Sequence, residues 1–171
     1  FAHCVGRTPL VNGARDKSAS GHDAFVDTEI INNVHFNWGN KGALYGGQLH
    51  SIVEGAYSRT NLINNYYKPG PATPNSAVRY RIAKIGVRTT AYCTNSDGTP
   101  NAWKPMEHVW GQFYVDGNVI EGNANVTADN WTKGIYEQIN NKECDNTFND
   151  QVKAEMKLSA PLETEFVTTH T

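Results

Sequence analysis

The side chains best suited to chemistry in this sequence are basic. Arg7 stands two residues before Pro9, whose ring fixes the local backbone and so holds the neighbouring segment in one direction. Because the pKa of arginine lies above about 12, Arg7 starts as a poor base and a good partner for a developing negative charge. Nearby cations would lower its pKa and make proton removal easier. The residue types alone leave these two roles open, beside that of an ordinary exposed arginine.

Three further basic residues are candidates for binding an acidic ligand. Arg15 lies in the polar loop that follows the Arg7 segment, and Lys41 opens a glycine-rich bend. Lys68 precedes Pro69 in a proline-rich stretch that is expected to be stiff and exposed. We therefore predict substrate-binding roles for Arg15, Lys41 and Lys68, with a solvated surface as the simpler alternative for Lys68.

The elements that would position these residues are indicated by a repeat in the sequence. The run Thr28–Asn37 returns at Thr60–Pro69, with a Thr, two aliphatic residues, an Asn pair and two bulky residues in register. A weaker third copy, Phe113–Asn123, puts Asn118 where Asn65 stands in the second copy. Repeats spaced by roughly 20–50 residues, as these copies are, indicate stacked units, because one unit cannot bury its apolar face alone.

The repeated core is short, β-branched and aromatic, which predicts strands. Asn tolerates left-handed backbone geometry, so the Asn pairs suit tight bends at the strand ends. Stacking would bring Asn33 over Asn65, where their amides could hydrogen-bond. We expect an all-β parallel β-helix, with a β-sandwich as the alternative. The segments 78–83 and 85–88 also read as strands.

Bulk composition limits the function classes. The 171 residues fit one domain, residues 1–171, and the polar tail 140–171 is expected to wrap the coils as long loops. No apolar run reaches the length of about 18 residues that a membrane span needs. A net charge of -2 gives no support for a nucleic-acid partner. Because both ends look cut, we expect the C-terminal portion of a longer coil stack, with the rest as a possible partner chain.

The three cysteines, Cys4, Cys93 and Cys144, do not match a metal-site spacing. Cys93 and Cys144 lie in polar, loop-like surroundings and form the preferred disulfide pair. The two N-glycosylation sequons begin at Asn125 and Asn130. Both features agree with a secreted, extracellular or periplasmic protein.

Several strings together are more specific than the repeat itself. They are Arg7-Thr8-Pro9, Asn32-Asn33-Val34-His35-Phe36-Asn37-Trp38-Gly39, Tyr45-Gly46-Gly47, Asn64-Asn65-Tyr66-Tyr67-Lys68-Pro69-Gly70-Pro71-Ala72-Thr73, Val115-Asp116-Gly117-Asn118-Val119 and Val126-Thr127-Ala128-Asp129-Asn130-Trp131. In these strings the sequence resembles the later half of the catalytic domain of secreted pectate lyases. The likeness runs from about residue 1 to about residue 135.

The resemblance implies a right-handed parallel β-helix that cleaves polygalacturonate, the backbone of pectin, by β-elimination. In the family, an Arg in an Arg-x-Pro segment removes the C5 proton of the uronate, and Arg7 matches it. A second Arg often follows the Pro closely; here Leu10, Val11 and Asn12 stand there. The family's calcium ions are held by coils that precede this segment, so no metal ligand is expected in this chain.

Two other classes stay open. A non-catalytic β-helix could hold an acidic glycan with the same coils without cutting it. A glycoside hydrolase would need closely placed carboxylates, and Asp116 and Glu121 are the acidic pair near a coil.

Overall fold

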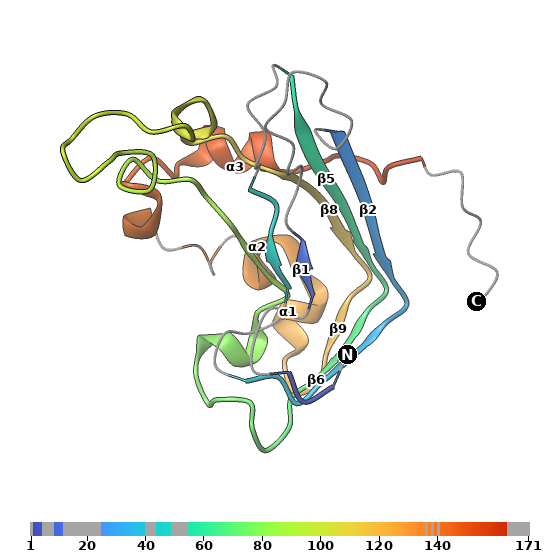
Figure 1. The fold of residues 1–171 in the computed structure, drawn as a ribbon. Coiled ribbons are helices and arrows are strands. Elements are labelled where there is room, and N and C mark those ends of the chain that lie inside the picture. Colours follow the sequence, from blue (N-terminus) through green and yellow to red (C-terminus); the bar gives the residue numbers. More distant parts are fainter. Residues whose placement is uncertain are drawn as a thin grey trace.

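The structure is a computed structural model that describes residues 2–4, 9–11, 25–39, 44–48, 55–135, 137, 139 and 141–163. Its strands form three parallel sheets of three strands each. These are β1-β4-β7 (Leu10–Val11, Leu44–Gly46, Ala83–Ile85), β2-β5-β8 (Phe25–Ile31, Tyr57–Ile63, Gln112–Asp116) and β3-β6-β9 (Val34–Phe36, Tyr66–Lys68, Val119–Ile120). Each sheet takes one strand from each of three successive coils, which stack as in a short parallel β-helix (Figure 1).

The pairing register confirms the repeat read from the sequence. Thr28 pairs with Thr60 across β2 and β5, and Ile31 pairs with Ile63. The third copy continues the same register, because Thr60 pairs with Phe113 in β8. All named strand pairs are parallel, which excludes the antiparallel β-sandwich.

Asparagines stack along the turns between the second and third sheets, as predicted. The backbone N–H of Asn33 donates to the Oδ1 of Asn65 at 3.0 Å, and its amide donates to the same atom at 3.2 Å. Asn65 donates to Asn118 in the same two ways, at 3.0 and 2.9 Å. Asn118 then donates to the Oδ1 of Asn130 at 2.8 and 3.1 Å. We call these four residues the asparagine ladder.

A residue with left-handed backbone precedes each of the first three ladder positions. These residues are Asn32, Asn64 and Gly117, with φ of 57°, 54° and 67°. In the third coil the residue must be small, because a Cβ on Gly117 would lie 2.1 Å from the Oδ1 of Asn64. The Asn-Asn and Gly-Asn pairs therefore specify the bend and the ladder together.

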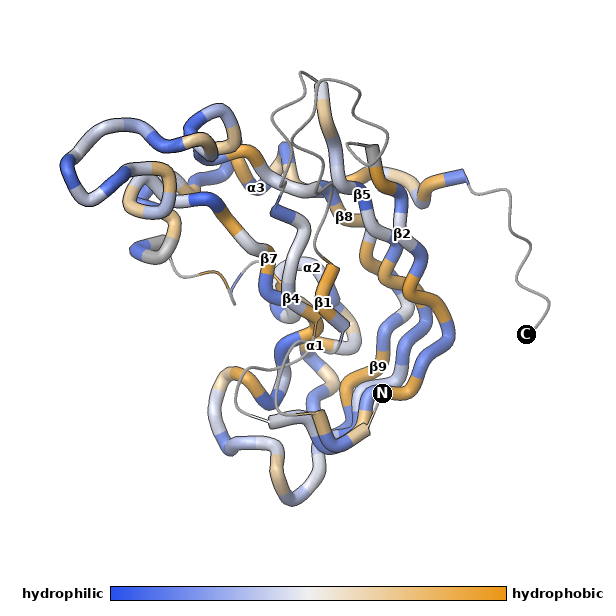
Figure 2. Tube along the Cα trace, in the orientation of Figure 1, coloured by the Kyte–Doolittle hydropathy of each residue, from blue (hydrophilic) through white to orange (hydrophobic). Residues whose placement is uncertain are grey.

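The core lies between the sheets and is closed by residues from all three coils. Leu62 and Phe113 are fully buried from the second sheet, and Tyr67 from the third. The ring of His35 stacks on Tyr67 at 4.4 Å, and Trp38 meets Tyr67 edge-on at 6.1 Å. Figure 2 shows apolar residues along the stacked strands and mostly hydrophilic ones in the long loop after β7.

Short helices close the stack after the third coil. Helices α1 (Ala124–Ala128) and α2 (Asn130–Gly134) follow β9, with α1 packed on β9 and α2 on β8. Their first turns are capped by the side chains of Asn123 and Asp129, which accept from Val126 N and Thr132 N at 3.1 and 2.9 Å. The asparagine ladder ends on α2, because its last member, Asn130, is the first residue of that helix.

The tail is less loop-like than predicted, and it does wrap the coils. It contains a 3₁₀ helix (Asn141–Cys144) and helix α3 (Asp150–Met156). Residues 157–162, here called the strap, then cross the outer face of the second sheet (Figure 1). Leu158 N donates to the Phe113 carbonyl at 2.9 Å, and the buried amide of Asn61 both donates to and accepts from the backbone of Leu162.

The strands expected at 78–83 and 85–88 are corrected by the structure. Residues Ala77–Tyr80 form a 3₁₀ helix, and a single short strand, β7, spans Ala83–Ile85. A further 3₁₀ helix, Lys104–Met106, lies in the long loop between β7 and β8. None of the described helices is long and apolar enough to cross a membrane.

Candidate functional site

The first sheet presents one outward row of side chains. Leu10 in β1 pairs with Tyr45 in β4, which pairs with Lys84 in β7. Their strand neighbours Val11, Leu44 and Ile85 are buried. Because side chains alternate between the faces of a strand, Leu10, Tyr45 and Lys84 share the outer face. We call these three the outer row.

Backbone contacts draw the three strands of this sheet close together. The N–H of Tyr45 donates to the Pro9 carbonyl at 3.2 Å, and the N–H of Gly86 donates to the Gly46 carbonyl at 2.6 Å. A Cβ on Gly46, whose φ is 142°, would lie 1.6 Å from the carbonyl oxygen of Val11. The glycine-rich bend predicted here is wrong over Leu44–Gly46, which form strand β4. Gly46 is instead required by the close approach of β1.

A cavity of about 340 Å³ lies beside the outer row. It is lined by the half-buried side chains of Tyr45 and Lys84, by Ile85 and Val87 from the end of β7, and by Ile139 and Cys144 from the chain after α2. The site combines one cation and one phenol with apolar walls. Such a combination is typical of sites that bind small or extended ligands.

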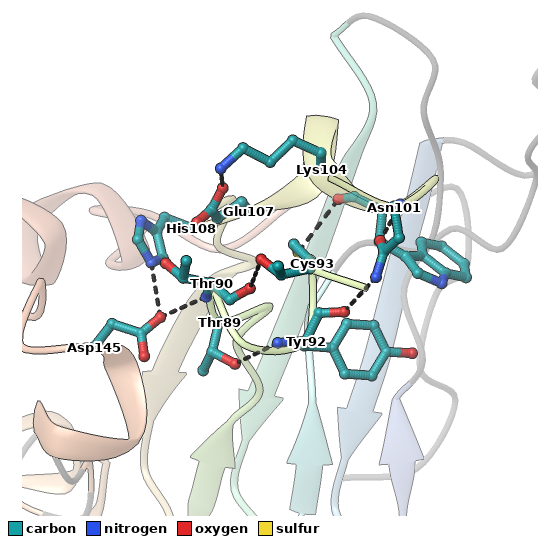
Figure 3. Close-up of polar contacts among 11 residues, drawn as sticks. Thr89, Thr90, Tyr92, Cys93, Asn101, Lys104, Glu107, His108 and Asp145 are labelled. Atoms are coloured by element: carbon teal, nitrogen blue, oxygen red, sulfur yellow. Dashed lines mark hydrogen bonds and ion pairs between the residues drawn. The ribbon is translucent and has the colours of Figure 1, made fainter. Parts of the chain in front are cut away.

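A polar cluster lies next to Cys144, one of the residues that line this cavity. Asp145, next to Cys144, accepts from the backbone N–H of Thr90 at 2.5 Å and lies 3.2 Å from Nε2 of His108 (Figure 3). The N–H of Thr90, with a smaller contribution from His108, holds the pKa of Asp145 below its ordinary value. Asp145 therefore joins the 3₁₀ helix Asn141–Cys144 to the long loop after β7.

Aromatic and cationic side chains also pack against one another within the loop after β7. The guanidinium of Arg88, a buried residue, lies over the rings of Tyr92 and Trp103, 4.2 and 5.2 Å from their centroids. The ring of His108 stacks on Trp110 at 6.0 Å with an interplanar angle of 8°. These contacts order the loop that carries Thr90.

The predicted catalytic and binding residues fall largely outside the described residues. Arg7, Arg15 and Lys41 all lie there. Pro9, two residues after Arg7, is described, and the chain runs from it directly into the outer row at Leu10.

Lys68 is not on the same sheet as the outer row. It ends β6 in the third sheet, with its Nζ 3.7 Å from a carboxylate oxygen of Glu121. Glu121 also accepts from the hydroxyl of Tyr66 at 2.7 Å, and this bond raises the pKa of Tyr66. Of the acidic pair that a hydrolase would need, Asp116 ends β8 in the second sheet, and Glu121 follows β9 in the third sheet, where Tyr66 and Lys68 contact it.

The predicted disulfide between Cys93 and Cys144 is not formed. Both residues are buried thiols. The Sγ of Cys93 donates to the carbonyl of Trp103 at 3.4 Å, and burial raises the pKa of Cys93. Cys144 packs in the hydrophobic core and lines the cavity. The polar, loop-like sequence around Cys93 and Cys144 therefore did not indicate that both side chains are buried.

The two sequons differ in access. Asn125 is exposed on α1, so its glycosylation stays a prediction. Asn130 is only 6% exposed, and its amide bonds to Asn118 and to the carbonyls of Val126 and Thr127. Glycosylation of Asn130 is therefore incompatible with this fold, because a glycan on that nitrogen would displace the end of the ladder.

Sequence reasoning missed Tyr45 and Lys84. The available signal was a single Lys between the apolar residues Ala83 and Ile85, and a single Tyr between Leu44 and Gly46. That signal marks an outward position on a short buried strand. It does not say that the two side chains are neighbours, which follows from the pairing of β4 with β7.

The described part of the chain contains no group of three or more His, Cys, Asp or Glu side chains that could hold a metal ion. In comparisons with known proteins, no family model matches the sequence, and no curated protein matches it significantly.

Proposed function

We propose that this chain forms part of a right-handed parallel β-helix of a secreted polysaccharide lyase, which cleaves polygalacturonate by β-elimination. The proposal rests on the resemblance of several strings to pectate lyases, and one structural observation supports it. The segment that follows Arg7 enters the outer row, beside a cavity that contains Lys84. A basic residue and a binding surface for an acidic polymer would then belong to the same sheet.

In this proposal Arg7, in its neutral form, accepts the C5 proton of a uronate residue and becomes a guanidinium. The electron pair of the broken C5–H bond forms the C4=C5 double bond. The bond between C4 and the glycosidic oxygen breaks, and that oxygen leaves with the bonding pair and takes up a proton from water. A cation beside the uronate carboxylate makes the C5 proton more acidic, because it stabilises the charge that develops during proton removal.

Calcium enters the proposal only through the resemblance, with its ligands on coils outside this chain. The described residues supply no such ligand group, so no step is assigned to the ion. The remaining coils, as part of the same polypeptide or as a separate chain, belong to the proposal as a partner.

The direct test is product formation. Polygalacturonate incubated with calcium and with the chain joined to its remaining coils should yield uronides with the C4=C5 double bond, detected by their ultraviolet absorbance. Arg7→Ala should lower kcat by at least about 100-fold, as expected for loss of a group that acts on the transferred proton. Arg59→Ala is the matched control, because Arg59 pairs with Asp27 on the outer side of the second sheet at 2.6 Å.

The outcomes separate the candidate functions. Unsaturated product lost in Arg7→Ala and kept in Arg59→Ala supports the lyase. Pectate binding without any unsaturated product, in the joined protein, would instead support the non-catalytic glycan-binding β-helix.

A further inference from the structure

A second cavity, of about 590 Å³, lies between the outer face of β8 and the strap. It belongs to the second sheet, and no described residue lines both this cavity and the one beside the outer row. We call it the strap cavity. Its lining includes Tyr114 and Asp116 of β8, Ala154 of α3, and Lys157, Leu158 and Ser159 of the strap.

Hydrogen bonds to β8 hold the walls of the strap cavity in place. The side-chain amide of Gln112 donates to the carbonyl of Glu155 at 3.2 Å, which fixes the end of α3. The backbone N–H of Leu158 donates to the carbonyl of Phe113 at 2.9 Å, which fixes the start of the strap. A ligand that enters this cavity therefore meets walls that are already ordered, and less of its binding free energy is lost in ordering them.

Two polar side chains of β8 are available in this cavity. Tyr114 and Asp116 are two residues apart on the strand, so they share its outer face. The main chain of Asp116 is fixed, because its carbonyl accepts from the backbone N–H of Asn64 and from the amide of Asn118, both at 3.1 Å. Within the part of the chain that the structure describes, neither the Asp116 carboxylate nor the Tyr114 hydroxyl has a hydrogen bond or an ion pair.

The charges of the lining favour a neutral ligand. Asp116 is negative and Lys157 is positive, so a ligand with a net charge is attracted by one and repelled by the other. The two are also too far apart for the zwitterion of one amino acid. Lys157 pairs with Phe113, three residues before Asp116, which places their main chains roughly 10 Å apart. The ammonium of Lys157 lies 5.8 Å from the ring centroid of Trp131.

We propose that the strap cavity binds a neutral sugar residue of a glycan. The ring of Tyr114 packs against the apolar C–H face of the sugar, and the carboxylate of Asp116 accepts hydrogen bonds from its hydroxyls. The hydroxyl of Ser159 adds a group that can donate and accept. The volume lies within the usual range of ligand sites, about 300–1,000 Å³, and suits a short segment of a glycan chain.

This site does not depend on the proposed lyase activity. It lies on the second sheet, whereas the segment after Arg7 enters the first sheet. An uncompensated carboxylate beside the sugar also disfavours a uronate, because like charges repel each other. The strap cavity would therefore hold a glycan that differs from the substrate of the elimination reaction.

The test is a titration followed by NMR, with the chain joined to its remaining coils. The probes are neutral tetrasaccharides of galactose, glucose and xylose. At least one should shift the backbone amides of Tyr114, Asp116 and Leu158 with a Kd of about 1 mM or lower. The amide of Tyr45 on the first sheet should keep its position in that titration. The tetramer of galacturonic acid should bind at these amides at least about threefold more weakly, because each of its sugars carries a charge that Asp116 repels.

Substitutions in the cavity identify the groups that bind. Asp116→Ala should raise Kd at least about tenfold, because a charged acceptor is lost. Asp116→Asn keeps the shape of the side chain and should still raise Kd about threefold or more. Tyr114→Ala should weaken binding, whereas Tyr114→Phe should stay within about twofold of wild type, because the ring is kept. Asp150→Ala, at an exposed position of α3 outside the cavity lining, is the matched control. Every variant must keep the thermal midpoint of the wild type.

Each outcome decides for or against the site. Weaker binding in Asp116→Asn and Tyr114→Ala, with wild-type binding in Asp150→Ala, supports it. No shift of these amides with any of the three neutral tetrasaccharides overturns it. So does tighter binding of the galacturonic acid tetramer than of every neutral probe, or a response to the zwitterion glycylglycine alone. Absence of elimination by the wild type leaves the result unchanged, because that assay tests Arg7.

Discussion

Asn118 shows how one side chain can hold three parts of this molecule together. It is fully buried in the turn after β8. Its Oδ1 accepts from the backbone and amide of Asn65, and its own amide donates to the carbonyls of Leu62 and Asp116 and to Asn130. Every polar atom of this buried amide is therefore used, which is the condition under which a buried polar group stabilises a fold.

Replacing Asn118 by Ala should lower the free energy of unfolding by about 2–4 kcal/mol, because it removes the acceptor of the buried Asn65 backbone N–H and the side-chain donor to the buried Leu62 carbonyl. Urea denaturation at neutral pH measures the change. Asn125→Ala on the exposed side of α1 is the control and should stay within about 0.5 kcal/mol of wild type. A loss for Asn118→Ala as small as the control's would mean that the ladder contributes no net stability.

At the scale of elements, Asn61 and Asp145 supply two of the polar contacts that attach the C-terminal part of the chain. Asn61 holds the strap through a pair of hydrogen bonds to Leu162, at 3.2 and 3.0 Å. Asp145 holds the 3₁₀ helix Asn141–Cys144 against the loop after β7. Both use a side chain where regular strand pairing is absent, so each can be removed without breaking a sheet.

Removing the Asn61 contact should loosen the strap alone. In Asn61→Ala the amide of Leu162 should exchange with solvent about 5–30-fold faster, which corresponds to the loss of about 1–2 kcal/mol. Hydrogen exchange read by NMR gives this rate. The amides of Asn65 and Asn118 serve as internal controls and should keep their protection, whereas an unchanged rate at Leu162 would show that other contacts hold the strap.

The contact of Asp145 should make stability depend on acid pH. Because the pKa of Asp145 is lower in the folded protein, the contact is fully present above the unfolded value of about 3.9 and is lost as pH falls through the folded value. Wild type should therefore exceed Asp145→Asn in stability at pH 7, and the difference should shrink as pH falls below about 3.9.

The partner of Asp145 can be identified by a double-mutant cycle with His108→Gln, measured by urea denaturation at pH 7. The two substitutions should be non-additive, since His108 contacts the same carboxylate that accepts from Thr90. An Asp145→Asn deficit that is the same at pH 7 and pH 2 would contradict the assigned ionisation.

At the scale of the whole molecule, the regular part of the fold was predictable and the irregular part was not. The asparagine ladder follows from the Asn pairs, since the same residue type at the same bend stacks when coils are in register. The interval between ladder residues changes from 32 between Asn33 and Asn65 to 53 between Asn65 and Asn118. The extra chain forms the loop after β7, whose path depends on packing and not on a local pattern.

The candidate site belongs to that irregular part. Lys84 and Tyr45 come from strands of three residues, too short to show an alternating pattern, and the walls at Ile139 and Cys144 come from the tail. The buried positions of Cys93 and Asn130 were missed for the same reason: long-range contacts decide burial there, and neighbouring residues do not.

The ladder has a further consequence because it ends on a helix. Asn130 on α2 supplies the Oδ1 acceptor that an asparagine of a fourth coil would otherwise offer to Asn118. Residues 157 and 158 cover the edge of β8. A parallel strand from another molecule cannot extend the stack on this side without first displacing both elements. Fibre-like growth, the usual hazard of a molecule made of repeated strands, is thereby blocked at this rim.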